Sequence, residues 1–339
     1  MITLLKKAGT CSVITAADII RQGGLVAFPT ETVYGLGADA TNAAAVRKIF
    51  AAKGRPADNP LIVHISNVDE LRLITPEVTT AAEKLIAAYW PGPLTIVLRK
   101  TPIIPDEVTC GLDTVGIRLP ADKTARRLIA ASGVPIAAPS ANKSGRPSPT
   151  RAEHVLRDLD GKIDMILDGG ATVFGLESTV VDALEDVPRL LRPGSVTAEM
   201  LRETCGNLVS DIEAYGVPPS PGMKYRHYAP RARLTLVIGE PESAAQAINK
   251  ILRAKTPGVT AGVLASAQTA GLYDKTRHVV LAAGDRNRPE TAGANLFALL
   301  REFDERNVRE IFAESLEETG AGLAVMNRLK KAAAEIIRL

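Results

Sequence analysis

The sequence predicts an α/β fold divided into two domains. Through the first two-thirds of the chain, short apolar segments bounded by Gly, Pro or Asp alternate with segments of helical periodicity. This alternation is typical of α/β domains. It resumes after a segment at 206–233 that is rich in proline and tyrosine. The length of 339 residues also agrees with two domains, at roughly 150 residues per domain.

The short apolar segments of the first domain are its expected strands. Several of them follow one another with no helix between, and parallel neighbours need a long crossover. We therefore expect a sheet of mixed rather than wholly parallel strands. The expected strands are 25–28, 61–65, 94–98, 115–119, 136–138, 165–167, 178–182 and 189–192.

Helices are expected where apolar residues recur at helical spacing. The segment 43–52 has one apolar face. The segments 81–89 and 151–159 each follow a capping box, in which a Thr hydroxyl caps the first turn and a Glu stands three residues later. The two capping residues are expected to be Thr80 and Thr150.

The segment 206–233 is expected to link two domains, 1–205 and 234–339. It contains four prolines, and proline disfavours both helix and interior strand. Plain linkers are polar and rich in Gly and Ser, whereas SPGMKYRHYAP is dense in aromatic and basic residues. We therefore expect this segment to contact a ligand or another part of the protein.

The last third of the chain predicts a smaller, Rossmann-like α/β domain. It contains no GxGxxG sequence and no evident catalytic cluster, so a structural or regulatory accessory role is expected. Strands are expected at 234–238, 262–265, 279–281 and 311–312. Helices are expected between the first two strands, ending at 252, then over about 290–306, and lastly after 312, running to the C-terminus.

The composition excludes several classes of protein. Apolar residues make up 46% and charged residues 23% of the chain, as in ordinary globular proteins. No run approaches the roughly 20 apolar residues of a membrane helix, and no secretory signal is found. Three widely spaced cysteines and four scattered histidines suit neither a disulfide framework nor a zinc site. A net charge of +3 does not by itself argue for nucleic-acid binding. We expect a cytoplasmic protein with no membrane association and no metal site of its own.

The first polar motif is PTETVYGLGADA, at 29–40. Its Gly35-x-Gly37 matches the dinucleotide fingerprint weakly, because the glycines lie seven residues beyond the expected strand. Turn glycines in a polar loop are the expected alternative. The polar cluster from Thr30 to Tyr34 stands at the carboxyl end of a strand, where α/β sheets bind ligands.

The second and third motifs carry four candidate cationic or titratable groups. KGRPADNPLIVHI places Lys53 and Arg55 on a loop stiffened by two prolines, which suits phosphate oxygens. The alternative is that both cations only interact with the dipole of the preceding helix. His64 is equally consistent with a core histidine. Arg118 of VGIRLP either faces solvent or binds a carboxylate or phosphate.

The remaining motifs add hydroxyl groups and another arginine. APSANKSGRPSPT, at 138–150, precedes an expected helix, whose N-terminus favours anions; a simple surface loop is the alternative. GLESTVVD and RLLRPG are expected to form adjacent strands, with Ser178 near the start of the first and Arg192 at the end of the second. P-loop, GxSxG and acidic two-metal patterns are absent. The pattern indicates a basic, hydroxyl-rich site that holds an anionic substrate without supplying a nucleophile.

In this order, the motifs resemble those of the YrdC family, the threonylcarbamoyl-AMP synthases. WPGPLTIVL, at 90–98, belongs to the same series, and SPGMKYRHYAP and GLAVMNRLKKAA resemble the two-domain form. The resemblance implies a YrdC-like twisted mixed sheet with a basic cavity. It also implies a nucleotidyltransferase that converts L-threonine, bicarbonate or CO2, and ATP into threonylcarbamoyl-AMP, pyrophosphate and water. A separate transferase complex would then pass the threonylcarbamoyl group to an adenosine of tRNAs that read ANN codons.

The resemblance further implies roles for individual residues. Catalysis would fall to Lys53 and Arg55, and Arg118 would pair with the threonine carboxylate. The expected L-threonine contacts are Thr32, His64, Arg118, Ala138 and Ser178. The expected ATP contacts are Arg55, Asn59, Thr114, Ser140, Ser148, Arg192, Tyr225 and His227. Mg²⁺ would accompany ATP, and the segment 206–233 would form a lid that excludes water from the labile carbamate and anhydride.

Two alternatives remain open at this stage. A basic concave face would bind double-stranded RNA or tRNA through its phosphates without catalysis, and its affinity would fall steeply with salt. A carbamoyl-adenylate-forming enzyme, similar to the YrdC-like module of hydrogenase-maturation proteins, would instead turn over ATP in the presence of carbamoyl phosphate. This chain lacks the CxxC zinc fingers that those proteins carry.

Overall fold

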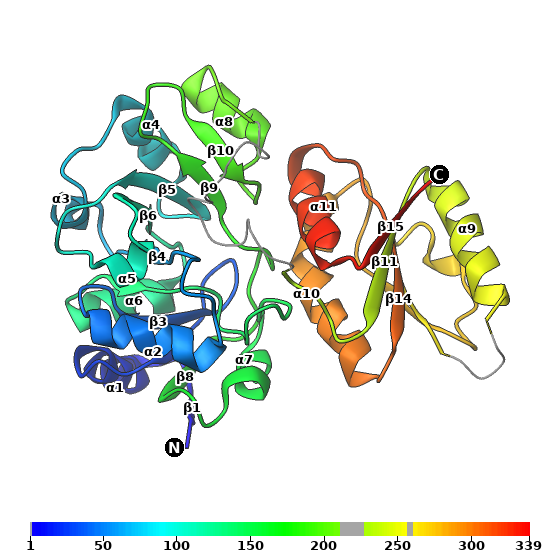
Figure 1. Ribbon diagram of the computed structural model, residues 1–339, viewed down its shortest axis with the longest axis horizontal. Helices are drawn as coiled ribbons and strands as arrows, with labels where there is room; N and C mark the ends of the chain where they lie inside the picture. Colours follow the sequence, from blue (N-terminus) through cyan, green and yellow to red (C-terminus); the bar gives the residue numbers. More distant parts are fainter. Residues whose placement is uncertain (1, 211–226, 256–259) are drawn as a thin grey trace. The chain divides into compact units, whose positions relative to one another are not determined.

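The structure is a computed structural model that describes residues 2–210, 227–255 and 260–339. The chain divides into two compact units. The first unit comprises residues 1–144 and 148–224, and the second comprises 145–147 and 225–339. Each unit is built on one β-sheet flanked by helices (Figure 1). Most of the segment 206–233, including Tyr225, lies outside the described residues.

In the described residues, the first unit contains a ten-stranded sheet in the order β1-β8-β2-β3-β7-β4-β6-β5-β9-β10. The expected mixed sheet is confirmed, because β6 pairs parallel with β4 and antiparallel with β5. The strands are β1 (Leu4–Lys7), β2 (Val26–Phe28), β3 (Gly35–Asp39), β4 (Ile62–His64), β5 (Leu94–Arg99), β6 (Thr114–Arg118), β7 (Ile136–Ala137), β8 (Met165–Asp168), β9 (Thr179–Asp182) and β10 (Arg189–Arg192).

The three helices expected in the first unit, at 43–52, 81–89 and 151–159, are confirmed, whereas its other helices were not predicted and two predicted caps are wrong. Thr79 rather than Thr80 caps α4, because its hydroxyl accepts the amide of Ala82 at 3.2 Å. At the start of α7, the amide of Thr150 donates to Nδ1 of His154 instead of its hydroxyl capping the helix. The helices are α1 (Thr10–Arg21), α2 (Ala43–Lys53), η1 (Val68–Glu70), α3 (Leu71–Ile74), α4 (Thr80–Tyr89), α5 (Asp106–Thr109), α6 (Lys123–Ser132), α7 (Ala152–Leu159) and α8 (Ala198–Cys205).

Alternating side chains of the first sheet enter two apolar cores. In β2, Ala27 joins the core that includes α2, α4, α7 and α8, whereas Val26 and Phe28 join a second core on the opposite face, formed with α1 and α6. Each fully buried Val, Leu, Ile or Phe contributes roughly 1.5–3 kcal/mol. The second core takes side chains from β2, β7 and β8. On that face, the strands β4, β6, β5 and β9 carry polar side chains, which are described below.

The expectation that Gly35 and Gly37 lie in a polar loop is wrong. They belong to β3, which runs antiparallel to β2 with Gly37 opposite Val26. A Cβ atom on Gly37 would lie 2.7 Å from Cγ2 of Ile136 and 2.8 Å from Cε1 of Phe28. Glycine is therefore required at this position for close packing. The sequence of β3, GLGAD, contains none of the β-branched or aromatic residues that are enriched in strands.

The second unit contains a five-stranded sheet in its described residues, in the order β13-β12-β14-β11-β15, with parallel pairing throughout. Helix α9 covers one face, and α10 and α11 cover the other (Figure 1). The elements are β11 (Arg233–Ile238), α9 (Pro241–Arg253), β12 (Gly262–Ala265), η2 (Ala270–Leu272), β13 (Val279–Ala282), α10 (Pro289–Glu305), β14 (Glu310–Glu314), α11 (Gly320–Ala332) and β15 (Glu335–Arg338).

The expected helix at the C-terminus ends earlier than predicted. Helix α11 stops at Ala332, because Ala333 adopts an extended conformation with φ −65° and ψ 137°. The following residues Glu335–Arg338 form β15, which pairs parallel with β11. The backbone groups that β11 would leave open at this edge of the sheet are thereby paired.

Candidate functional site

Strands β4, β6, β5 and β9 present polar side chains on the face opposite the core of α2, α4, α7 and α8. Val63, Ile117, Ile96 and Val181 enter that core, so the neighbouring residues of each strand point to the other face. That face carries a small apolar cluster, formed by Val97, Val180 and Leu191. It also carries His64, Thr95, Gly116, Arg118 and Ser178. We call this surface the polar face of the first sheet.

Arg118 is a buried cation on the polar face and donates three hydrogen bonds to neighbouring residues. It ends β6, and its side chain is 4% exposed. Its Nη2 donates to Oε1 of Glu31 at 2.6 Å, its Nη1 to Oγ1 of Thr32 at 2.9 Å, and its Nε to the carbonyl of Gly92 at 3.2 Å. These contacts engage three of the five N–H groups of a guanidinium. The remaining two suit a carboxylate, which guanidinium binds in a fork.

Glu31 keeps the charge of Arg118 balanced inside the protein. Burial raises the pKa of the Glu31 carboxyl, but the charge of Arg118 and the hydrogen bond from Arg118 together lower it by more than burial raises it. The net pKa lies below the ordinary value, so Glu31 is ionised at neutral pH. Its Oε2 also accepts the amide of Asp122 at 3.3 Å. A charged buried partner of this kind fixes the orientation of the arginine. The sequence analysis included Glu31 in the polar cluster from Thr30 to Tyr34 but gave it no role of its own.

His64 lies beside Arg118, because the two residues pair in register between β4 and β6. Burial, followed by the charge of Arg118, lowers the pKa of His64 to about 3. The imidazole is therefore neutral, and it meets the ring of Phe28 edge-on with centroids 6.1 Å apart. Its buried Nδ1 has no hydrogen-bond partner among the described residues. A buried polar atom of this kind is costly unless a ligand or water satisfies it.

The buried neutral His64 predicts acid sensitivity of the first unit. The pKa falls from 6.5 in the unfolded chain to about 3 in the folded one, so the unfolded chain binds more protons between these values. The contribution of neutral His64 to the free energy of unfolding is therefore complete above pH 6.5 and is lost as the pH falls toward 3. At pH 5 the loss should be about 2 kcal/mol, at about 1.4 kcal/mol per unit.

This loss can be measured by urea unfolding followed through Trp90, the single tryptophan of the chain. We expect His64→Gln to lose about 2 kcal/mol less stability than the wild type between pH 7 and pH 5. Glu31 titrates below its ordinary value of 4.5 and leaves this window unaffected. Equal losses in both proteins would contradict a neutral His64.

Ser178 connects β5 with Arg192. Its hydroxyl lies 2.8 Å from Oγ1 of Thr95. Nη2 of Arg192 donates to the same hydroxyl at 3.1 Å, and Nε donates to the carbonyl of Ser178 at 3.1 Å. The structure thus brings together one residue predicted to bind threonine and one predicted to bind ATP. Thr95 was missed by the sequence predictions, although it lies in WPGPLTIVL.

Lys53 is buried at the end of α2, where it is 2% exposed. Its Nζ donates to the carbonyl of Asn142 at 2.6 Å and to the carbonyl of Ser140. Gly54, in the left-handed conformation with φ +60°, ends the helix and turns the chain. Lys53 therefore contacts the loop of APSANKSGRPSPT, in addition to lying near the negative end of its own helix. The hydroxyl of Ser140 donates to Oδ1 of Asn142 at 2.5 Å.

The loop after Lys53 is folded around the side chain of Arg55. Nε of Arg55 donates to the carbonyl of Asn59 and Nη2 to the carbonyl of Pro60, both at 3.0 Å. These bonds close the short loop on itself, and the residue Arg55 is 9% exposed. The loop carries Arg55 as predicted, whereas Lys53 is the last residue of α2 and not part of the loop. The hydrogen bonds of Arg55 contribute to the shape of the loop.

The other predicted site residues take simpler positions. The hydroxyl of buried Ser148 donates to Oε1 of Glu177, a second carboxylate that the sequence predictions missed. Thr114 begins β6, half-buried, opposite Arg99 of β5. Buried Ala138 donates its amide to the carbonyl of Ile62 at 2.9 Å. Its side chain packs at the end of β7 and offers no polar group.

His227 and Tyr228 belong to the second unit. Tyr228 is 4% exposed, its ring stacks on Phe297 with centroids 5.1 Å apart, and the guanidinium carbon of Arg328 lies 5.9 Å from the ring centroid. The half-buried His227 lies against it, with ring centroids 5.5 Å apart. Tyr228 therefore fastens this part of the motif SPGMKYRHYAP to the core of the second unit, while Tyr225 lies outside the described residues.

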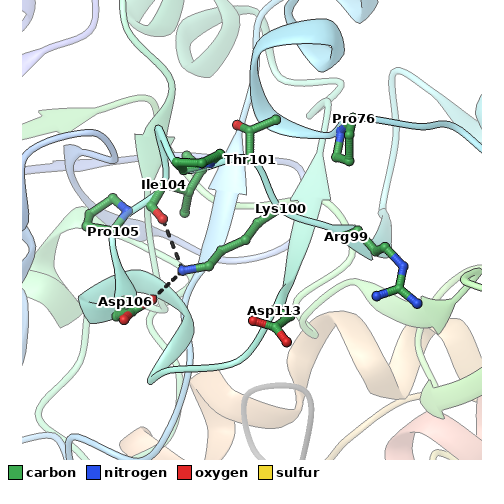
Figure 2. Close-up of a pocket in the computed structure, with 9 residues that line it drawn as sticks. Pro76, Arg99, Lys100, Thr101, Ile104, Pro105, Asp106 and Asp113 are labelled. Carbon is green, nitrogen blue, oxygen red and sulfur yellow. Dashed lines mark hydrogen bonds and ion pairs between the residues drawn. The ribbon is translucent and has the colours of Figure 1, made fainter.

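A separate pocket of about 570 Å³ opens on the first unit and contains none of the predicted site residues. Lys100 lies on its wall and donates to Oδ1 of Asp106 at 2.5 Å and to the carbonyl of Ile104 at 3.1 Å (Figure 2). Arg99 and Asp113 point from its other walls. Cations and carboxylates balance each other here, so this pocket lacks the basic, hydroxyl-rich character of the polar face.

The polar face and its loops combine four buried cations with several hydroxyl groups. The cations are Lys53, Arg55, Arg118 and Arg192. Within the residues that the structure describes, no group of three or more His, Cys, Asp or Glu side chains could hold a metal ion. No helix in that part of the chain is long and apolar enough to cross a membrane. The arrangement can bind carboxylate and phosphate groups and lower the energy of developing negative charge.

Comparisons with known proteins decide the family. A family model described as "Telomere recombination" matches residues 18–194, and a model described as "Threonylcarbamoyl-AMP synthase, C-terminal domain" matches 196–334. A threonylcarbamoyl-AMP synthase of Bacillus subtilis is 49% identical over 94% of this chain and 92% of its own. The chain belongs to the threonylcarbamoyl-AMP synthase family. The predicted two-domain form of that family is confirmed.

More distant relatives and a solved structure agree with this assignment. A threonylcarbamoyl-AMP synthase of Schizosaccharomyces pombe is 42% identical over 95% of this chain and 88% of its own. A crystal structure of Pyrococcus abyssi Sua5 complexed with L-threonine superposes with a TM-score of 0.90 at 45% identity, covering 100% of this chain and 99% of that one. The predicted fold and the predicted enzyme class are therefore confirmed at the level of the family.

Proposed function

We propose that the chain makes threonylcarbamoyl-AMP from L-threonine, bicarbonate or CO2, and ATP, with release of pyrophosphate and water. The observation that carries this proposal is the pair formed by Arg118 and His64. Arg118 is a buried guanidinium held by Glu31, and His64 beside it is neutral, with an unsatisfied Nδ1. Such a pair recognises a carboxylate together with a neutral hydrogen-bond donor, and an amino acid such as threonine supplies a carboxylate and a hydroxyl.

The proposed threonine site is formed by five residues of the first unit. Arg118 would bind the substrate carboxylate with its two remaining N–H groups. Nδ1 of His64 would accept a hydrogen bond from the threonine hydroxyl or amine. The hydroxyls of Thr32 and Ser178 and the small side chain of Ala138 would complete the site. The complex of Pyrococcus abyssi Sua5 with L-threonine supports a site of this specificity in a close structural relative.

The proposed ATP site uses the cations and hydroxyls of the neighbouring loops. Lys53 would exchange one of its two carbonyl partners for a phosphate oxygen, and Arg55 would carry the second positive charge. We assign the remaining contacts to Asn59, Thr114, Ser140, Ser148, Arg192, Tyr225 and His227. Buried cations interact with phosphate more strongly than exposed ones because water screens them less.

The proposed reaction needs no protein nucleophile. Where bicarbonate is the source, it takes up a proton and loses water to give CO2. The threonine amine adds to CO2 and loses a proton to form a carbamate. A carbamate oxygen then attacks the α-phosphorus of ATP while pyrophosphate leaves. Lys53 and Arg55 would lower the barrier by stabilising the charge that develops on the phosphoryl oxygens, and Arg118 would orient the amino acid. The segment 206–233 would act as a lid, because carbamates and mixed anhydrides are hydrolysed by water.

Mg²⁺ enters this proposal as a partner of ATP. The carboxylates of the site are already engaged, Glu31 with Arg118 and Glu177 with Ser148. The described residues therefore suit a metal ion that the triphosphate carries, with no protein cluster around it. The ion would reduce the charge of the phosphates, while the cationic side chains position them.

The product implies a partner that uses it. We propose that threonylcarbamoyl-AMP passes in the cytoplasm to the transferase complex that modifies tRNAs reading ANN codons. The proposal includes a direct contact with tRNA, which we expect to be weak because the net charge of the chain is only +3. The lability of a mixed anhydride favours transfer soon after synthesis.

Pyrophosphate release by the purified full-length chain tests the proposed function. We expect release from ATP to require both L-threonine and bicarbonate, and a threonine- and carbonate-labelled adenylate to appear in proportion. Release that depends on carbamoyl phosphate would favour the carbamoyl-adenylate reaction instead. The absence of threonine stimulation together with salt-sensitive RNA binding would favour the RNA-binding alternative.

A further inference from the structure

The polar face of the first sheet is ordered into rows, because β4, β6 and β5 pair in register. His64 of β4 lies opposite Arg118 of β6, and both residues belong to the proposed threonine site. Two residues earlier in β6, Gly116 lies opposite Ile62 of β4 and opposite Val97 of β5. We call Ile62, Gly116 and Val97 the middle row of the polar face.

The middle row lies between the two proposed substrate sites. On one side of it, Arg118 is proposed to bind the threonine carboxylate, and on the other side, Thr114 is proposed to contact ATP. Residues that share one face of a strand are spaced at about 6.7 Å. In threonylcarbamoyl-AMP, five bonds separate the carboxyl carbon of threonine from the phosphorus, and they span roughly 6 Å, because an extended chain advances about 3.3–3.6 Å per three bonds. A carboxylate beside the row of Arg118 therefore places the phosphorus over the middle row.

The centre of the middle row has no side chain. The two neighbours of Gly116 in β6 enter the core on the opposite face, so a side chain at this position would point to the polar face. A Cβ atom there would have as its nearest neighbours Cγ2 of Thr95 at 3.1 Å, Cγ1 of Ile62 at 3.6 Å and Cγ2 of Val97 at 4.0 Å. These three atoms belong to the two flanking strands. Among the described residues, no element packed over the sheet comes as close to this position.

The backbone of Gly116 is accessible on the polar face. Its neighbours Thr95, Ile62 and Val97 are buried, whereas Gly116 is only half-buried. The core covers the opposite face of the strand, so the accessible surface of Gly116 lies on the polar face. Ile62 and Val97 have no side-chain group that forms hydrogen bonds. A ligand can therefore approach the backbone closely at this point, as is found at other glycines in strands.

We propose that the carbamate of threonine and the α-phosphate of ATP are joined over Gly116, in the space that the missing side chain leaves. The proposal rests on the proposed function and assigns the place of its chemical step. There the carbamate oxygen bonds to the α-phosphorus, and the pyrophosphate oxygen leaves with the electron pair of the broken bond. A side chain at position 116 would keep the reacting atoms apart, although each substrate alone could shift slightly and still bind.

The test adds a single methyl group, as Gly116→Ala in the full-length chain. We expect kcat for pyrophosphate release to fall roughly a hundredfold, because a misplacement of about 1 Å can have an effect of this size. The Kd for L-threonine and the Kd for ATP should each change less than about threefold when calorimetry measures them in the absence of the other substrate. Loss of turnover with binding retained distinguishes the proposal from general damage to the site.

Thr95→Ser provides the control for crowding inside the protein. It removes Cγ2, the atom nearest to the added methyl group, and keeps the hydroxyl that lies 2.8 Å from Oγ of Ser178. With Thr95→Ser as the baseline, we expect Gly116→Ala to lower kcat by about the same factor as in the wild type. The double variant also decides the question if Gly116→Ala alone fails to fold.

Three results would overturn the proposal. The first is a kcat of Gly116→Ala near that of the wild type. The second is a loss of binding of either substrate alone that equals the loss of turnover. The third is recovery of kcat when Thr95→Ser is combined with Gly116→Ala. Pyrophosphate release by the wild type without a requirement for L-threonine would instead overturn the proposed function.

Discussion

Replacing Arg118 by Ala should lower kcat/KM for L-threonine by roughly a hundred- to a thousandfold. The substitution removes the proposed partner of the substrate carboxylate and leaves Glu31 charged and buried without its ion pair. Truncating one partner of a buried, hydrogen-bonded charge pair costs about 3–4 kcal/mol of binding free energy, and about 1.4 kcal/mol is a factor of ten, so this cost corresponds to the stated range. The measurement is pyrophosphate release as a function of threonine concentration, at saturating ATP.

Two further variants separate substrate binding from damage to the protein. Arg118→Lys keeps the charge but loses the planar fork, and we expect it to recover only part of the activity. Lys100→Ala is the matched control, because Lys100 is a well-covered cation in an ion pair with Asp106, in the separate pocket. A normal KM for threonine in a folded Arg118→Ala protein would contradict the proposed carboxylate contact.

Replacing Lys53 by Met should lower kcat by roughly a hundred- to a thousandfold, with a smaller change in the KM for L-threonine. Removing one preorganised group that stabilises transition-state charge costs about this much in other enzymes. The substitution also leaves the carbonyls of Ser140 and Asn142 without their shared donor. Single-turnover formation of the labelled adenylate measures the chemical step directly.

Lys48→Met provides the comparison for this variant. Lys48 lies in the same helix, and its Nζ also donates to a backbone carbonyl, that of Gly23, at 2.7 Å. Both substitutions therefore remove a lysine-to-carbonyl hydrogen bond from α2, although Lys48 is exposed and Lys53 is buried. Of the two side chains, Lys53 is the one that contacts the loop that contains Ser140. If both variants lowered kcat by the same factor, a structural effect would explain the result and the catalytic role of Lys53 would be wrong.

The sequence predicts the strands of the first sheet well where they are apolar and short. Leu61–Ile65 and Val115–Leu119 become β4 and β6, and the polar residues His64 and Arg118 then meet because the two strands pair in register. The strand Gly35–Asp39 was not predicted, because its glycines carry no strand signal and its extended conformation depends on pairing with β2 and with the distant β7. β15 was missed for a related reason, since its four residues are extended only in the presence of β11.

Partners of the site residues were harder to predict than the residues themselves. Glu31 and Glu177 both lie inside motifs that the sequence marks, but a carboxylate in a motif has no preferred partner until the chain folds. The bond between Arg146 and Asp304 joins residues 158 positions apart. Periodicity and turn chemistry describe neighbours along the chain, so a contact of this range cannot be derived from them.

The division of the first sheet into two halves has a consequence for how the enzyme can change over generations. On β2, β7 and β8 both faces are packed into apolar cores, so a substitution there would act mainly on how much folded enzyme a cell maintains. On β4, β6 and β9 one face is packed and the other carries the polar groups. A new substrate preference therefore has to arise on this half, where breaking a buried pair such as Arg118–Glu31 costs about 3–5 kcal/mol. The stability supplied by the packed half then limits how many such changes the enzyme tolerates.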